Sequence, residues 1–581
     1  MRTVLFLSIM VLMGCGRKEP AGGMTELTEQ YVYTTLAFSP VAATAAGYHV
    51  HAGTRLDERL DDYSEASLAR QRKFYQDFQA HLQREVNASA LPAEDLTDHD
   101  MLRDQAALAL FQLDVLEPQR HNPTVYVELI GNAIFTPFTV EYAPFADRAR
   151  HIIARLRAVP AFLDQAKANL VDSPEVWTDT AIEENEGNIR LINETVRKPV
   201  PSELSGEYDQ AASHALEALM DFSSFLRNEL KKRPAEWRLG PEKYARKFRL
   251  VLGTDESPDH ILQQAEAGLE ETRLELFELA KRILNRPKAA ATQADQVIRQ
   301  ALEQVAQTRS TPSTYMTDAR RDLFEIEQFV RKTGLVPLVG RENLQIIDTP
   351  EFMRGIYAVG GFNPAPPLEP GLGAFYWLTP IPSDWPEERV QSKLKEYNAF
   401  SLKLLTIHEA MPGHYLQFEY ADNVEPESRR LLRAVYGSGT YIEGWAVYSA
   451  EAMLDAGYLE NSPELRLTFL KQMLRVLANA ILDIRLHTMG LADREALDLM
   501  VKRTFQETEE AQAKLRRAKL SSCQLPTYYA GHREWKRLRD HCRKWQGDAF
   551  QLARFHESAL RAGAVPVPAL ARLLTGKRLG E

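Results

Sequence analysis

One pattern covers more than half of the chain and limits what the chain can fold into. From residue 26 to about residue 331, apolar side chains recur at intervals of three and four, the spacing of one face of an amphipathic helix. The clearest segments are residues 66–85, 96–116, 147–170, 203–232, 259–284 and 294–308. Proline-bearing stretches such as residues 198–201 separate them. We therefore expect a helical N-terminal region over residues 25–332.

The pattern changes near Thr333. Two short stretches, residues 334–340 and 344–350, contain β-branched residues and are bounded by turn residues, which predicts strands. In residues 371–380 aromatic residues precede Pro380, so we expect a strand at a sheet edge, where a proline is tolerated. Helical periodicity returns over residues 401–411, 428–434, 440–456, 463–487 and 493–515. The sequence thus predicts a mainly α protein with one small β-sheet in its C-terminal half.

Residues 408–414 read His-Glu-Ala-Met-Pro-Gly-His. A zinc hydrolase needs two imidazoles and a carboxylate as ligands, a free position for water and a nearby base, and this motif supplies most of them. The common motif places its two histidines four apart, whereas His408 and His414 are six apart, about 600° round an unbroken helix. Pro412 lacks an N–H and Gly413 tolerates a positive φ, so we expect the helix to bulge or restart and return His414 to the face of His408.

Two questions stay open when the residues are considered alone. A kinked core helix that carries two incidental histidines has the same pattern. The third ligand could be Glu443, or it could be Glu451, which lies about 80° further round the same predicted helix and could instead orient a ligand histidine. Glu419, five residues after His414, is a further alternative.

The motif His-Glu-Ala-x-Pro-Gly-His, followed by Glu-Gly-Trp-Ala-x-Tyr-x-x-Glu at residues 443–451, resembles the bacterial "domain of unknown function 885" family. Members of that family are often lipoproteins and are grouped with zincin-like, gluzincin-type metallopeptidases. The likeness runs from about Met24 to the C-terminus. It implies a zincin-like catalytic region at residues 333–581 that binds one Zn²⁺ ion. The implied site residues are His408, His414 and Glu443 as ligands and Glu409 as the general base.

Attack of water on an amide also needs a donor that stabilises the oxyanion as it forms. Two further stretches resemble family motifs: a tyrosine with glycine three positions on, here Tyr528, and an aspartate with histidine four positions on, here Asp483 and His487. The resemblance suggests Tyr528 and His487 as catalytic groups, with a packed, amphipathic tyrosine as the structural alternative. The chain departs from the family pattern at Ser522-Cys523, where Pro-Gly is usual.

The N-terminus predicts export and lipid attachment. An apolar run over residues 4–13 is too short to span a bilayer and leads into Leu-Met-Gly-Cys, which has the form of a lipobox. We expect a lipoprotein signal peptide over residues 1–15, anchorage to a membrane through lipid on Cys15, and a tether over residues 16–24. Gly16 favours the outer membrane, facing the periplasm. A plain secretory peptide is the alternative.

Charge and cysteine content add two constraints. The net charge of −10 and the pI near 5.9 argue against nucleic-acid binding, which requires a basic face. Beyond Cys15, only Cys523 and Cys542 remain. They could form a disulfide in an oxidising compartment or remain two separate thiols. The sequence does not indicate an oligomeric state.

These features together predict a zinc metallopeptidase that cleaves peptide or peptide-like amide bonds of short substrates in the cell envelope. Two alternatives belong to other classes. One is a metal-dependent amide hydrolase that acts on other substrates, and the other is an envelope binding lipoprotein that has lost activity. The presence of Glu409 argues against the second alternative, because loss of the base is the simplest route to inactivity.

Overall fold

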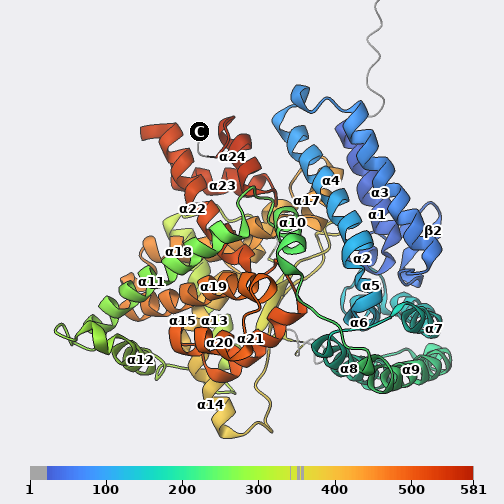
Figure 1. Ribbon diagram of the computed structural model, residues 1–581, viewed down its shortest axis with the longest axis horizontal. Coiled ribbons are helices and arrows are strands. Elements are labelled where there is room, and N and C mark those ends of the chain that lie inside the picture. The colour runs from blue at the N-terminus through green and yellow to red at the C-terminus, as the bar shows by residue number, and fades with distance from the viewer. Residues whose placement is uncertain (1–22, 341, 350–353, 355–358, 580–581) are drawn as a thin grey trace, which may run out of the picture.

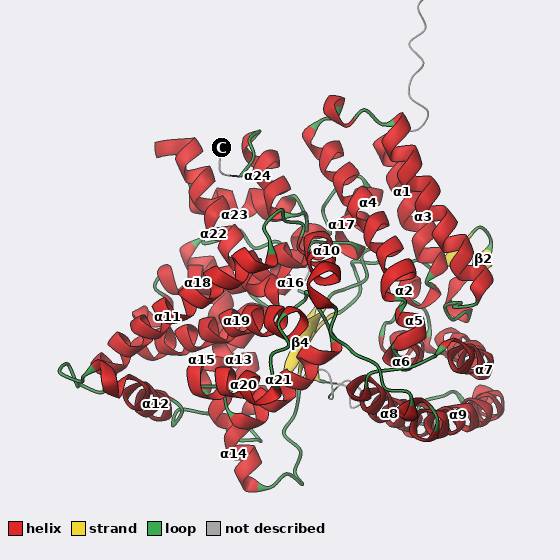
Figure 2. Ribbon diagram, in the orientation of Figure 1, coloured by secondary structure: helices red, strands yellow, loops and turns green. Residues whose placement is uncertain are grey.

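The computed structural model describes residues 23–340, 342–349, 354 and 359–579, so the predicted signal peptide and most of the tether lie outside it. Helices make up most of the described chain, and the strands form two separate small sheets (Figures 1 and 2). The expectation of a mainly α protein with a small sheet in its C-terminal half is confirmed, but the sequence did not predict the second sheet, in which β1 (Val50–His51) pairs with β2 (Thr54–Arg55). None of the described helices has the combination of length and apolar content that a membrane crossing requires.

Two groups of helices form most of the N-terminal half. The first, blue in Figure 1, contains α1 (Met24–Phe38), α3 (Glu65–Glu85) and α4 (Ala93–Phe111). The second, teal and green, contains α6 (Thr124–Thr139), α7 (Phe145–Asn169), α8 (Glu175–Arg190) and α9 (Ser205–Asn228). This second group encloses most of a separate hydrophobic core. The predicted segments 66–85 and 147–170 match α3 and α7 to within two residues.

One predicted helix is interrupted. Residues 493–515 form α20 (Asp493–Asp498), a π-helical turn (Leu499–Arg503) and, after a break, α21 (Thr508–Leu520). The break contains Phe505, whose φ of 57° lies in the left-handed region, where a right-handed helix cannot continue. Helix α21 is therefore free to take a direction of its own.

The larger sheet, in the C-terminal half, has three strands in the order β3 (Leu344–Asp348), β5 (Ala374–Leu378), β4 (Gly360–Asn363). Strand β5 is parallel to β3 and antiparallel to β4. The prediction of an edge strand before Pro380 is therefore wrong, because that strand is β5, the central one. Pro380 lies beyond the last paired residue of β5 and removes no hydrogen bond from the ladder. Residues 334–340 contain no strand, contrary to prediction.

The expected boundary at residue 332 does not separate two cores. Leu36 and Leu102 from the N-terminal half belong to the same hydrophobic cluster as Tyr441 and Trp445. Helix α1 packs directly against α17 (Glu427–Val435). The helices that carry the candidate site are therefore supported from both halves of the chain. Cys523 and Cys542 are buried, separate thiols.

Candidate metal centre

Helix α15 (Ala399–Glu409) ends at the first half of the histidine motif. Its N-terminus is capped by the side chain of Asn398, which accepts from the backbone N–H groups of Phe400 and Ser401. The chain then turns through residues 410–413, with a cis peptide between Met411 and Pro412. Helix α16 (His414–Ala421) starts at the second histidine. The helix thus restarts between the two histidines, as the sequence predicts.

Gly413 has a different role in this turn from the one predicted. Its φ is −72°, outside the left-handed region. A Cβ at this position would overlap the carbonyl oxygens of His408 and Ile407, and the N–H of Gly413 donates to Ile407 O at 3.0 Å. Glycine is therefore required because the turn folds back onto the end of α15, and this close approach brings His414 beside His408.

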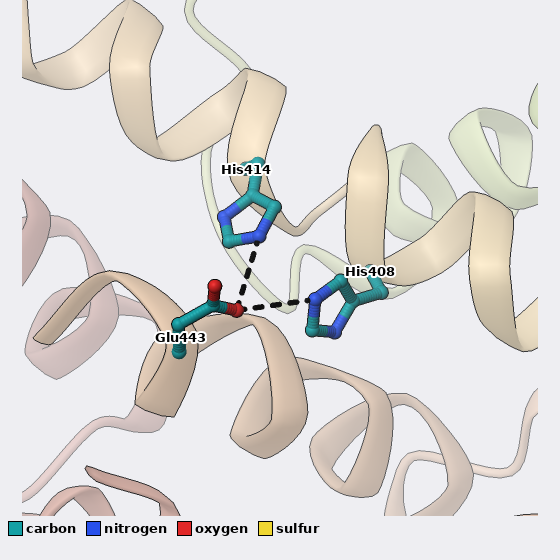
Figure 3. A group of neighbouring side chains, drawn as sticks. All are labelled: His408, His414 and Glu443. Atoms are coloured by element: carbon teal, nitrogen blue, oxygen red, sulfur yellow. Dashed lines mark ion pairs between the residues drawn. The ribbon is translucent and has the colours of Figure 1, made fainter. Parts of the chain in front are cut away.

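Helix α18 (Gly439–Asp455) supplies the third group. Glu443 Oε2 lies 3.4 Å from His408 Nε2 and 3.5 Å from His414 Nε2, and the ligand atoms of the three residues all lie within 4.8 Å of one another (Figure 3). Ligand atoms about 2.0–2.1 Å from a tetrahedral zinc ion are separated by about 3.4 Å. Both distances to Glu443 match the edge of such a tetrahedron.

The electrostatics of the three residues also fit a cation. Within the described part of the chain, Glu443 Oε2 is buried and accepts no hydrogen bond. Burial alone would raise the pKa of the Glu443 carboxyl, but the two imidazoles hold it well below its usual range. The carboxylate is therefore charged, desolvated and placed between two nitrogen donors, which is the donor set that Zn²⁺ prefers.

Glu409, the predicted base, lies beside this group at the end of α15. Burial raises the pKa of its carboxyl to about 7, with Glu443 acting in the same direction. His408, Arg517 and a hydrogen bond from the backbone of Phe362 in β4 act in the opposite direction. A carboxyl that titrates near neutral pH can both accept and return a proton, which is the property a general base requires.

The whole chain, and not only this site, resembles known proteins. The family described as "Bacterial protein of unknown function (DUF885)" matches residues 40–574. The chain belongs to the DUF885 family. A solved structure from Shewanella oneidensis, described as "a putative lipoprotein of unknown function", is 26% identical with a TM-score of 0.79, and the match covers 95% of this chain and 100% of that one. A second, a "putative lipoprotein" from Colwellia psychrerythraea, is 18% identical with a TM-score of 0.77 and covers 95% and 98%. No curated protein matches the chain.

In this DUF885 protein, Tyr528 lies next to the candidate ligands. It sits in the first turn of α22 (Pro526–Gln546), and its ring is nearly parallel to that of His408, with centroids 6.4 Å apart. Burial and the neighbouring Glu443 raise the pKa of the phenol, so Tyr528 stays protonated and able to donate. Its oxygen accepts from Gln524 Nε2 at 3.4 Å. Tyr528 is thus a protonated phenol beside His408.

His487 is not available for the oxyanion role that the sequence suggested. Its Nδ1 accepts from the backbone N–H of Leu239 at 3.4 Å, and its Nε2 pairs with Ser521 O at 3.0 Å. Its ring packs between Tyr244 and Trp237. Burial lowers the pKa of His487 to about 4, so the ring is neutral at physiological pH. Both ring nitrogens are engaged within the protein.

Asp483 and His487 instead hold the loop that leads to Tyr528. Asp483 Oδ1 accepts from Tyr244 OH at 2.6 Å and from the N–H of Cys523 at 3.0 Å, while His487 binds Ser521. Cys523 has a φ of 65°, a left-handed conformation that glycine adopts most easily. The two motifs are thus connected in space, and Cys523 adopts a left-handed conformation at the position where the family motif has glycine.

Of the other candidate ligands, Glu451 is fully engaged elsewhere. Its carboxylate pairs with His532 Nε2 at 2.7 Å and with Lys536 Nζ at 2.8 Å, both on α22. It therefore orients His532, which is not one of the candidate ligands. Among the described residues, the group that could hold a metal ion includes neither Glu451 nor Glu419.

Two glycines that sequence reasoning missed bring the ligand helix and the tyrosine helix together. Helices α18 and α22 cross with Gly444 against Gly531, and a Cβ on Gly444 would lie 2.6 Å from the Cα of Gly531. The crossing places Glu443 of α18 near Tyr528 of α22. The signal was present in the sequence, because each glycine is adjacent to or three residues from a predicted site residue.

Proposed function

We propose that this DUF885 protein is a zinc-dependent hydrolase, zincin-like in its site, that cleaves peptide or peptide-like amide bonds of short substrates. The convergence of His408 Nε2, His414 Nε2 and Glu443 Oε2 at the spacing of a tetrahedral site carries the proposal. Three protein ligands leave the fourth position open, as catalytic zinc sites do and structural sites do not. One Zn²⁺ ion is the implied cofactor.

The residues around the site support hydrolysis. When bound, zinc supplies Lewis acidity, which acidifies water and polarises a carbonyl group. Glu409 would accept the proton of the attacking water and return it to the leaving amine, a role that its near-neutral pKa allows. The O–H of Tyr528 would donate to the carbonyl oxygen as that oxygen gains negative charge.

We also propose that the protein is a lipoprotein of the cell envelope, anchored through lipid on Cys15. Two observations support this location. Residues 12–15 have the form of a lipobox. The Shewanella oneidensis structure, 26% identical over nearly the full chain, carries the description of a lipoprotein.

Metal content and turnover test the hydrolase proposal together. We expect the purified protein to contain about one zinc ion and His408→Ala to contain none, while His260→Ala, on an exposed face of α11 (Pro258–Ile283), retains the metal. Glu409→Gln should keep the metal and lower kcat by about 10²–10⁴-fold. Substrates are sought among dipeptide, tripeptide and muropeptide pools with chelator controls. Stoichiometric zinc in His408→Ala would remove the site, and cleavage of muropeptides alone would replace the peptidase with another amide hydrolase.

A further inference from the structure

Helix α21 carries two cations on one of its faces. Lys514 and Arg517 are three residues apart, which places their side chains one above the other on the helix surface. The other faces of α21 are occupied: Ala511, Leu515 and Ala518 belong to a hydrophobic cluster, and Arg516 pairs with Glu183 of α8 at 2.8 Å. The face with Lys514 and Arg517 is left to interact with the candidate site.

The ends of this face are fixed beside the site. At one end, Glu510 accepts from the hydroxyl of Tyr397, just before α15 begins. At the other end, the carbonyl of Ser521 is bound by His487, and Gln524 then reaches Tyr528. The face that carries Lys514 and Arg517 therefore lies between the start of α15 and the loop that leads to Tyr528.

Lys514 is a buried residue whose amine has no described partner. The residue is only 9% exposed, and among the described residues none forms a hydrogen bond or an ion pair with its Nζ. Burial, and then Arg475 and Arg517, lower the pKa of Lys514, while Glu510 and Glu443 raise it. Burial disfavours the charged form of an unpaired amine, and a nearby carboxylate favours that form, so this amine is suited to pair with an anionic ligand.

The acidic groups near Lys514 are already committed. The carboxylate of Glu510 lies 3.8 Å from the guanidinium of Arg475 as well as accepting from Tyr397. Glu443 faces the two imidazoles of the metal centre. Neither acid approaches within 4 Å of Lys514, so no described carboxylate is paired with its amine.

Arg517 lies one turn after the buried Lys514 and is exposed to solvent. No ion pair to its guanidinium occurs within the described chain. Its charge nevertheless acts on Glu409 and on Tyr528, the predicted base and the predicted oxyanion donor. A guanidinium in this position presents paired N–H donors that match a carboxylate.

We propose that Lys514 and Arg517 bind a carboxylate of the substrate, and that this carboxylate is the free C-terminus of a short peptide. The protein would then be an exopeptidase that cleaves at a fixed distance from the C-terminus of the peptide. The inference rests on the proposed hydrolase function for the cleavage step, but the binding step can be tested without turnover. A carboxylate on an aspartate or glutamate side chain has the same chemistry, and the test separates the two.

The test uses Glu409→Gln protein, so that peptides bind without being consumed. Three probes are compared by calorimetry and by the shift in Tm. They are dipeptide and tripeptide pools with a free C-terminal carboxylate, the same pools as C-terminal amides, and amidated pools that contain one internal glutamate. Lys514→Met and Arg517→Gln are introduced into this protein. Arg516→Gln is the matched control, because it removes a cation from the same helix on another face.

We expect free-carboxylate pools to bind about 10–100-fold more tightly than amides, the range for a hydrogen-bonded charge pair. Lys514→Met and Arg517→Gln should each remove most of that preference, and Arg516→Gln should keep it. Lys514→Met should also raise the Tm of the free protein, since it replaces an unpaired buried amine with an apolar side chain. If Lys514→Met fails to fold, Arg517→Gln decides alone.

Equal binding of carboxylate and amide pools, or a preference that survives in both variants, would overturn the proposal. If an internal glutamate restores the binding of an amidated peptide, the bound group is a side-chain carboxylate and not the C-terminus. The two proposals fail separately. Turnover by the wild-type protein without zinc would contradict the hydrolase proposal. The binding comparison tests the carboxylate site whether or not metal is bound.

Discussion

Two adjacent tyrosines on α22 allow the oxyanion role to be tested by removing a single oxygen atom. Tyr528 lies against His408, whereas Tyr529 is packed in the main core and its hydroxyl points toward α11 near Gly268. Tyr528→Phe should lower kcat by about 10²–10³-fold with unchanged zinc content, because a donor to the developing oxyanion is lost. Tyr529→Phe should leave kcat within about threefold, since a hydroxyl away from the site adds nothing to transition-state binding.

Steady-state kinetics on a cleaved peptide, together with metal analysis of each variant, would check this prediction. A Tyr528→Phe variant that loses zinc would assign the tyrosine to the shape of the site instead. Equal losses in both variants would point to a general effect on α22.

Side-chain chemistry could be predicted from the sequence where the motif itself specified it. The motif identified His408 and His414, the family resemblance selected Glu443 from three candidate acids, and the structure brings these three together. His487 could not be assigned correctly, because a motif shows that a residue belongs to a pattern but not which atoms it contacts. Lys514 gave no signal at all, since an unpaired lysine on an amphipathic helix looks like any other lysine until its burial is known.

The helix crossing at Gly444 and Gly531 sets the distance between α18 and α22. Gly444→Ala should lower the free energy of unfolding by about 1–3 kcal/mol and weaken zinc binding, because the added methyl group pushes Glu443 away from the histidines. Gly206→Ala is the control, because that glycine is exposed on α9 with nothing within 4 Å of the added Cβ. It should leave stability unchanged or raise it slightly.

Urea unfolding and zinc titration of both variants measure these two effects. A Gly444→Ala protein with wild-type stability and zinc affinity would show that the crossing tolerates the extra volume and that the two helices do not fix the site.

Glu451 joins the same two helices through charge, which makes the contact dependent on pH. Burial raises the pKa of Glu451, but His532 and Lys536 hold it at about 2, below its ordinary value of 4.5. A carboxyl with a lowered pKa stabilises the fold fully above its ordinary value, and this stabilisation is lost as the pH falls toward about 2. Glu451→Gln should therefore cost about 1–3 kcal/mol at pH 6 and progressively less below pH 4.5.

The measurement is the difference in unfolding free energy between wild type and Glu451→Gln at several pH values from 6 to 3.5. A difference that stays constant over this range would mean that the carboxylate contributes by packing and not by its charge.

Helices could be located from periodicity because a helix is a local structure, and α3 and α7 lie within two residues of the predicted segments. The place of β5 in the sheet could not be predicted, since strand order depends on partners far along the chain. The break near Phe505 depends on a single left-handed residue within an otherwise periodic segment, and periodicity averages over it.

Across the whole molecule, the first group of N-terminal helices is part of the support for the site. Helices α1 and α4 share a core with α18, and the single chain buries both halves together. The expected boundary at residue 332 followed a change in local pattern, but a local pattern contains no information on which distant helices pack together. We therefore regard residues 25–332 and 333–581 as parts of one structure.

Arg433 is the buried charge that joins the two halves. It lies on α17, is 2% exposed, and binds Asp98 and Glu94 of α4 at 2.8 and 2.7 Å and the carbonyl of Ala562 near the C-terminus. Arg433→Met should lower the free energy of unfolding by about 3–5 kcal/mol, because Asp98 remains buried with one partner fewer. The control is Arg561→Met, because Arg561 is exposed and pairs with Glu557 on the same helix. This change should lower the free energy of unfolding by less than about 0.5 kcal/mol.

A second substitution, Asp98→Asn, shows whether Arg433→Met destabilises the protein by removing an attraction or by leaving the charge of Asp98 with too few partners. If the cost of Arg433→Met comes from the charge of Asp98, which then keeps only Arg429 as a partner, Asp98→Asn in the same chain should recover part of the lost stability, so that the double variant is more stable than the sum of the single changes predicts. Unfolding followed by tryptophan fluorescence and by circular dichroism would give the same midpoint if both halves unfold together. Two separate transitions in wild type would show that the halves are independent after all, and the role assigned to Arg433 would then be wrong.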